Sequence, residues 1–87
     1  MENTEIKVNL NDIKMQDGMF VYGDYVLAPQ KNVFNGLTSW WLSKKLYIIN
    51  VYTTSTQNGE KIFVEYAAKM FEQYIPYLET IYRKAVA

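Results

Sequence analysis

The feature that most constrains the fold is a long amphipathic segment over residues 60–85. At about 100° per residue, its apolar side chains gather on one side and its charged side chains on the other. The central apolar positions are Phe63, Ala67, Met70, Tyr74, Leu78, Ile81 and Ala85. The opposite side holds Glu65, Lys69, Glu72, Gln73, Glu79, Thr80 and Arg83. Because this apolar side is wide, a flat surface is needed to cover it, and we expect a sheet packed against one long C-terminal helix. The helix is expected at about 59–85, with Asn58 as its N-cap.

Pro76 lies inside this segment, on its polar side. A proline in a helix interior removes the backbone hydrogen bond to the carbonyl of Glu72 and costs about 3 kcal/mol. On the solvent side the freed carbonyl can bond water, and the bend can wrap the helix around the core. Because the apolar stripe keeps its phase across Pro76, the pattern favours a single helix kinked there over two helices broken near residue 75.

The N-terminal part of the chain predicts an antiparallel sheet of three or four strands. Residues 4–10 alternate apolar and polar side chains, which is typical of a half-buried strand. Further strands are expected at about 19–27, 39–43 and 46–54, where β-branched and aromatic residues are frequent. Asp17-Gly18 between two apolar runs predicts a type I′ hairpin. We therefore expect one α+β domain over residues 1–87.

The connections between these strands are less strongly specified. Gly23-Asp24 fits either a type II′ turn or a bulge, and we favour the bulge because two hairpins four residues apart leave a very short strand. Pro29 is expected to end strand pairing, so that residues 28–38 form a loop. Ser43 to Lys45 is expected to turn the chain, although no Gly or Asn there supplies a positive φ.

The side-chain inventory removes several kinds of chemistry. The chain has no cysteine and no histidine, so disulfides, thiolate nucleophiles and histidine bases or metal ligands are absent. The four glycines are isolated, so no glycine-rich phosphate loop exists. We therefore expect a protein that is not an enzyme and that holds no metal and no cofactor.

The charge balance and hydropathy bear on partners and location. Nine basic and nine acidic residues cancel, which favours neither a nucleic acid nor a polycation as partner. The N-terminus lacks the basic and apolar regions of a signal peptide, and no apolar run approaches about 18 residues. We expect a cytoplasmic protein that does not contact a membrane.

Trp40-Trp41 next to Lys44-Lys45 forms one candidate contact site. Adjacent residues of a strand face opposite ways, so one tryptophan should enter the core while the other faces out. The outward tryptophan either packs beneath the proline loop, or fills a pocket of a protein partner, or stacks on a base with the lysines on phosphate.

Exposed aromatic residues elsewhere form further candidate contacts. Tyr66 and Tyr77 flank one edge of the helix's apolar side and Tyr82 flanks the other, and the sheet either covers these edges or leaves them as a contact surface. Val33 and Phe34 are apolar residues in an otherwise polar loop, and we expect them to tuck back onto the fold unless they too contact a partner.

These observations favour a small protein-binding module. No family motif is present, but the small size, the single domain and the richness in Asn, Lys, Ile and Tyr are typical of small accessory proteins of bacteriophages and mobile elements. Such proteins often occlude a host protein, such as a defence nuclease, so inhibition of a host protein is one expected role. Two alternatives remain open: a homodimeric structural protein and a sheet domain that binds single-stranded nucleic acid.

Overall fold

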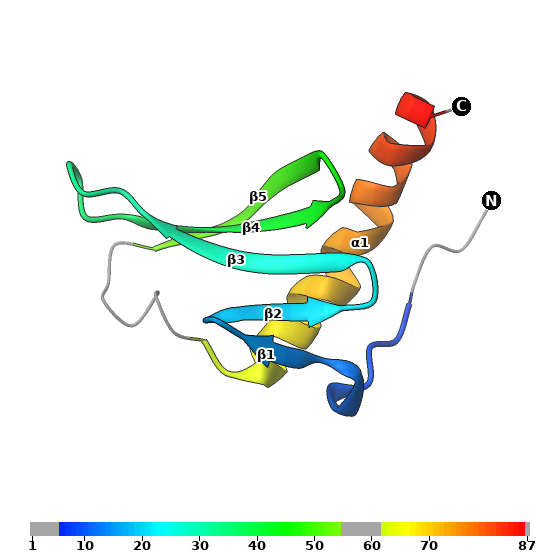
Figure 1. Cartoon of the computed structure of the whole chain (residues 1–87), viewed down its shortest axis with the longest axis horizontal. Helices are drawn as coiled ribbons and strands as arrows, with labels where there is room; N and C mark the ends of the chain where they lie inside the picture. The colour runs from blue at the N-terminus through cyan, green and yellow to red at the C-terminus, as the bar shows by residue number, and fades with distance from the viewer. Residues whose placement is uncertain (1–5, 55–61, 87) are drawn as a thin grey trace.

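The computed structural model describes residues 6–54 and 62–86, which form an α+β fold of two layers (Figure 1). A five-stranded antiparallel sheet of order β1-β2-β3-β4-β5 packs against one C-terminal helix, α1. The elements are η1 (Leu10–Asp12), β1 (Lys14–Gln16), β2 (Met19–Tyr22), β3 (Tyr25–Lys31), β4 (Thr38–Lys44), β5 (Tyr47–Thr54) and α1 (Val64–Val86). The predicted fold class is confirmed, while the predicted count of three or four strands is too low. None of the described helices is both long and apolar enough to cross a membrane.

The strand predicted at residues 4–10 is wrong for the part that the structure describes. Residues 6–9 form no strand, and Leu10–Asp12 is a short 3-10 helix capped by Asn9, whose side chain accepts the N–H of Asn11 at 2.9 Å. Apolar and polar residues alternate over residues 6–9 because this segment packs against α1 with its apolar side chains. Val8 is buried, and its backbone N–H donates to the carboxylate of Glu72 at 2.9 Å.

Two tight turns connect the first three strands. Asp17 and Gly18 both have positive φ, of 54° and 80°, which confirms the predicted type I′ hairpin between β1 and β2. Gly23, with φ of 59°, turns the chain between Tyr22 and Tyr25, so the favoured bulge is wrong. The short strand β2 persists because it is paired on both sides.

Pro29 lies within β3 and is paired with Trp40, so the predicted loop at 28–38 is wrong. β2 pairs with β3 only as far as Leu27, and from there β3 has a free edge on that side. A proline is tolerated on a free edge because its missing N–H breaks no ladder there. The connection between β3 and β4 is therefore short, at residues 32–37, and is called the hairpin tip below.

The turn predicted at residues 43–45 lies further along the chain. Lys44 pairs with Tyr47, so Lys45 and Leu46 form the turn between β4 and β5. Lys45 supplies the positive φ, at 57°, which is unusual for a residue with a Cβ atom.

One helix runs through Pro76, as predicted, although it begins at Val64 rather than near residue 59. The predicted N-cap Asn58 lies outside the described residues. The buried face is rotated from the predicted one toward Phe71 and Ile75, while Phe63 is 82% exposed. The core joins this face to the sheet and comprises Val8, Phe20, Leu27, Trp40, Leu42, Ala67, Ala68, Met70, Phe71, Ile75 and Leu78. Near Pro76, the hydroxyl of Thr80 donates to the Pro76 carbonyl at 3.0 Å.

Candidate functional site

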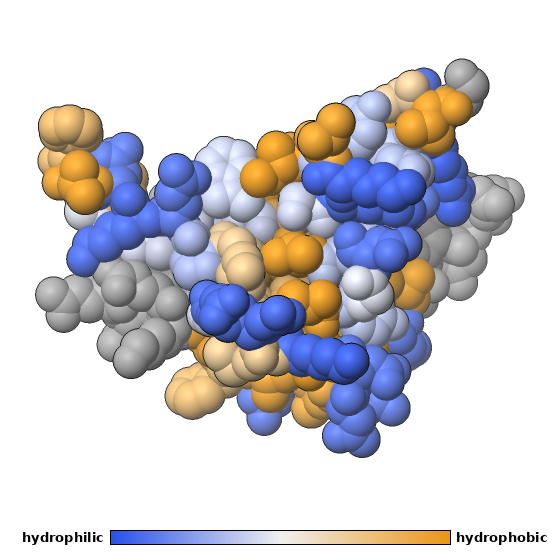
Figure 2. Space-filling model, viewed as in Figure 1, coloured by the Kyte–Doolittle hydropathy of each residue, from blue (hydrophilic) through white to orange (hydrophobic). Residues whose placement is uncertain are grey.

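The hairpin tip projects from the body of the molecule and carries two exposed apolar side chains (Figures 1 and 2). Val33 is 83% exposed and Phe34 is 95% exposed. The expectation that they tuck back onto the fold is therefore wrong. β3 and β4 pair as far as Lys31 and Thr38, and this long hairpin holds the tip away from α1.

Hydrogen bonds within the hairpin tip fix its backbone. The side-chain oxygen of Asn32 accepts the N–H groups of Phe34 at 2.8 Å and Asn35 at 3.4 Å. The Asn32 N–H donates to the Leu37 carbonyl at 2.8 Å, and the Gly36 N–H donates to the Asn32 carbonyl at 2.9 Å. The side-chain oxygen of Asn35 also accepts the Leu37 N–H at 2.9 Å. Phe34 thus stands exposed on a loop whose conformation its own asparagines hold.

The two tryptophans lie on opposite faces of β4, as the alternation predicts. Trp40 is 1% exposed and packs against Phe20, with ring centroids 6.0 Å apart. It is therefore a core residue. Trp41 faces the other way and is half-buried, and its indole N–H is buried without an acceptor.

A hollow of about 220 Å³ lies next to Trp41, where the hairpin tip joins the sheet. It is lined by Gln30, Lys31, Asn32, Ser39 and Trp41. Two amide side chains, a hydroxyl and a lysine thus lie beside an aromatic residue. The hollow and the hairpin tip share Asn32, so together they form one continuous surface.

The face of the sheet opposite α1 has an apolar centre with polar residues around it, and we call it the outer face. The strand register places Lys14, Val21, Val26, Ser43 and Ile48 in one row across it, with Ala28, Trp41 and Asn50 in the next. Figure 2 shows apolar side chains in the middle of the sheet. Ile48 is 57% exposed, whereas the valines are half-buried. This face extends from the hollow to β5.

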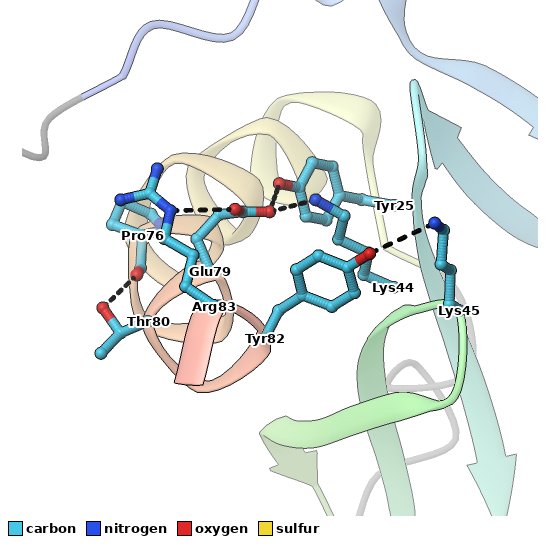
Figure 3. Close-up of polar contacts among 8 residues, drawn as sticks. All are labelled: Tyr25, Lys44, Lys45, Pro76, Glu79, Thr80, Tyr82 and Arg83. Carbon is cyan, nitrogen blue, oxygen red and sulfur yellow. Dashed lines mark hydrogen bonds and ion pairs between the residues drawn. The ribbon is translucent and has the colours of Figure 1, made fainter. Parts of the chain in front are cut away.

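The lysines predicted beside the outward tryptophan lie elsewhere. Lys44 points to the helix side of the sheet, where its ammonium lies 2.5 Å from a carboxylate oxygen of Glu79 (Figure 3). The same ammonium lies over the ring of Tyr82, 4.2 Å from its centroid. Lys45 donates to the Tyr82 hydroxyl at 3.2 Å. The tryptophan–lysine constellation is therefore divided between two faces of the molecule.

Glu79 is the centre of a polar cluster that the sequence did not predict. Its carboxylate accepts the hydroxyl of Tyr25 and the ammonium of Lys44, and lies 3.5 Å from Nε of Arg83 (Figure 3). The spacing of the apolar residues predicts that Glu79 lies on the solvated side of the helix, and this prediction is wrong. The rotation of the buried face turns it toward the sheet instead.

This cluster changes the proton affinities of its members. Hydrogen bonds from Lys44 and Tyr25 lower the pKa of Glu79. The bond to Glu79 raises the pKa of Lys44. Burial, and then the neighbouring Glu79 carboxylate, raise the pKa of Tyr25 to about 12. At neutral pH the cluster is thus a carboxylate, an ammonium and a neutral phenol, which suits it to joining the hairpin to the helix.

The predicted helix tyrosines lie on both edges of the buried face. Tyr82 is half-buried and meets Tyr47 edge-on, with centroids 5.6 Å apart. On the other edge, Tyr66 is 41% exposed and Tyr77 is 60% exposed. Tyr66 contacts Tyr52 of β5 edge-on at 5.3 Å, and burial raises the pKa of Tyr66. One edge is therefore covered and the other is open.

Within residues 6–54 and 62–86, no group of three or more acidic side chains is arranged to hold a metal ion. Comparison with protein-family models, with curated proteins and with solved structures finds no match for this chain.

Proposed function

We propose that this protein is a binding module that inserts Phe34 into an apolar pocket of a protein partner. The observation that supports this most directly is the exposure of Phe34, 95%, on a loop fixed by hydrogen bonds. A phenylalanine buries about 150–250 Å² when it enters a pocket, and such an anchor is worth about 2–4 kcal/mol of binding free energy.

The fixed backbone of the hairpin tip makes this contact favourable. A loop that must be ordered on binding loses conformational entropy, which weakens the complex. Here the side chains of Asn32 and Asn35 hold the loop before any partner arrives. The bonds leave Phe34 free to make contacts, because they use its backbone N–H and not its ring.

The outer face supplies the area around this anchor. The hollow beside Trp41 offers the polar side chains of Gln30, Asn32 and Ser39. These groups could exchange hydrogen bonds with polar groups of the partner. A partner held at Phe34 and Trp41 would have its own pocket blocked, so inhibition by steric occlusion is the mode of action that we propose.

The division of the two predicted lysines removes the support that they gave to the nucleic-acid alternative, although Lys31 lines the hollow beside Trp41. In that alternative, Lys44 and Lys45 hold phosphate beside a base stacked on Trp41. Lys44 instead pairs with Glu79 on the helix side. The Lys45 ammonium contacts Tyr82 on that same side.

Site-specific photo-crosslinking tests the proposal. A photoreactive phenylalanine replaces Phe34 in one variant and Leu46 in the matched control, because Leu46 is 93% exposed in the turn at the other end of β4. We expect position 34 to give a discrete crosslinked protein adduct and position 46 to give none. An excess of unlabelled wild-type protein should prevent formation of the adduct, whereas an excess of Phe34→Ala should not. Equal competition by Phe34→Ala would disprove the assignment of the anchor.

A further inference from the structure

The two edges of the sheet differ in how they are protected. Soluble proteins keep edge strands from pairing with other chains by making them short, charged or interrupted. β1 is three residues long and carries Lys14. β5 is eight residues long and has neither a charged residue nor a proline. Its one interruption is at Val51, where the pairing with β4 shifts between Trp40–Tyr52 and Trp41–Asn50.

The stretch Tyr47–Asn50 of β5 is regular and can accept another strand. It pairs with β4 without interruption from Lys44–Tyr47 to Trp41–Asn50. In an antiparallel edge strand, alternate residues turn their N–H and C=O groups away from the sheet. Ile48, in the middle of this stretch, is 57% exposed. Figure 1 shows the first part of β5, next to the turn from β4, at the upper margin of the sheet.

The helix layer carries two exposed tyrosines on this side of the molecule, at the same helical phase as the exposed Gln73 and Lys84. The contact between Tyr66 and Tyr52 shows that the open edge of α1 lies toward β5. Tyr77 follows Tyr66 by 11 residues, about three helical turns, and so lies on the same side of α1. Tyr66 is 41% exposed and Tyr77 is 60% exposed. We call the surface formed by Ile48, Tyr52, Tyr66 and Tyr77 the β5 rim.

We propose that the β5 rim is the contact surface for a second copy of this chain. In this dimer, β5 pairs antiparallel with β5 of the copy about a two-fold axis, and the tyrosines of the two α1 helices meet in the second layer. The sheet then continues across the two copies.

Three observations favour a second copy as the occupant. The rim presents a strand edge in one layer and two exposed tyrosines in the other, and a copy of the chain offers the same two layers in the same arrangement. No charged residue lies in β5, so pairing it with itself brings no like charges together. The chain as a whole is also neutral, with nine basic and nine acidic residues, so the copies do not repel each other at long range.

The strength of the contact follows from its size. Only about four residues of each β5 pair regularly before the shift at Val51, so we expect a weak, reversible dimer with a Kd on the order of 100 µM. Sedimentation equilibrium up to about 0.5 mM measures it, since most of the protein would then be dimeric.

Three variants test the assignment. Ile48→Lys places a charge on the strand edge, Tyr77→Lys places one on the helix edge, and Val33→Lys is the matched control on the hairpin tip, at an 83% exposed position. We expect both rim variants to weaken the dimer about tenfold or more and the control to leave it unchanged. Far-ultraviolet circular dichroism verifies that each variant is folded, and Tyr77→Lys decides the matter if Ile48→Lys does not fold.

Two results would overturn the inference. One is a single monomeric mass for the wild-type protein over the whole concentration range. The other is a dimer that the folded rim variants do not weaken. The dimer does not depend on the proposed partner binding, because Phe34→Ala should leave the dimer intact while Tyr77→Lys, on the helix layer, should leave competition for the position-34 adduct intact. The two proposals can therefore fail separately.

Discussion

The ammonium of Lys44 and the carboxylate of Glu79 lie 2.5 Å apart and join the end of β4 to the last third of α1. Their side chains are 14% and 18% exposed, so solvent screens the pair less than it screens most surface ion pairs. Tyr25 adds a hydrogen bond from β3 to the same carboxylate. Three elements therefore meet at one acidic side chain, whose protonation state bears on stability.

We expect Glu79→Gln to lower the free energy of unfolding at pH 7 by about 1–2 kcal/mol, because it leaves Lys44 without its counter-charge. The pKa of Glu79 is lowered in the folded state, so its contribution is complete above the unfolded pKa of about 4.3 and is lost as the pH falls through the folded value. Urea unfolding between pH 7 and pH 3 measures this. The difference between wild type and Glu79→Gln should shrink in acid, and a constant difference would contradict it. Glu65→Gln, at an exposed helix position, is the control.

Ionisation of Tyr25 should lower the stability of the protein at alkaline pH. Its pKa of about 12 lies above the usual value of 10.0, so its contribution is complete below pH 10 and is lost as the pH rises toward 12. Tyr25→Phe removes this titration, so the stability of the variant should fall less steeply over that interval than that of the wild type. Chemical denaturation at several pH values measures the slopes, with the exposed Tyr77→Phe as control. Parallel slopes for wild type and Tyr25→Phe would show that the cluster does not hold the phenol neutral.

Replacement of Lys45 by glycine should stabilise the protein, because of the backbone conformation at this position. Its φ of 57° is unfavourable for a residue with a Cβ atom and favourable for glycine. The contact with Tyr82 that would be lost is exposed. We expect Lys45→Gly to raise Tm by about 3 °C, whereas Lys45→Ala, which keeps the Cβ atom, should not raise it. Differential scanning calorimetry distinguishes the two, and an equal Tm for both variants would contradict the role of the backbone.

The aromatic residues of the β3–β4 hairpin should differ sharply in their effect on folding. Trp40→Ala removes a 1% exposed core ring and should cost about 3–5 kcal/mol of unfolding free energy. Phe34→Ala removes a 95% exposed ring and should change it by less than about 0.5 kcal/mol. Urea unfolding of the two variants measures this. A large loss of stability in Phe34→Ala would mean that the ring packs on the fold and is not a free anchor.

The features that the sequence predicted well are those that depend on neighbouring residues. The Asp17-Gly18 hairpin follows from turn chemistry, and the helix through Pro76 follows from the phase of its apolar stripe. The opposite orientation of Trp40 and Trp41 follows from strand alternation.

The features that it missed depend on partners distant in the chain. Pro29 fits inside a strand only because β2 ends beside it, which no local pattern shows. Val8 alternates like a strand residue, but its N–H is bonded to Glu72, 64 residues away. Glu79 reads as a solvated helix residue until Tyr25 and Lys44 are placed against it.

The candidate site likewise has some features that the local sequence predicts and others that depend on distant parts of the chain. Residue type alone marked Phe34 as an apolar residue in a polar loop, but its exposure depends on where the long β3–β4 hairpin projects. The hollow beside Trp41 likewise arises where two strands separate into the hairpin tip.

The order of the elements has a consequence for how the chain folds during synthesis. Each strand pairs with the one before it, so the sheet can form by successive local hairpins as the chain emerges from the ribosome. The residues that cover its inner face belong to α1, which follows all five strands. Until α1 has been made, the apolar face that becomes the core is open to water and to other nascent chains, which makes this the interval in which a chaperone would be most useful.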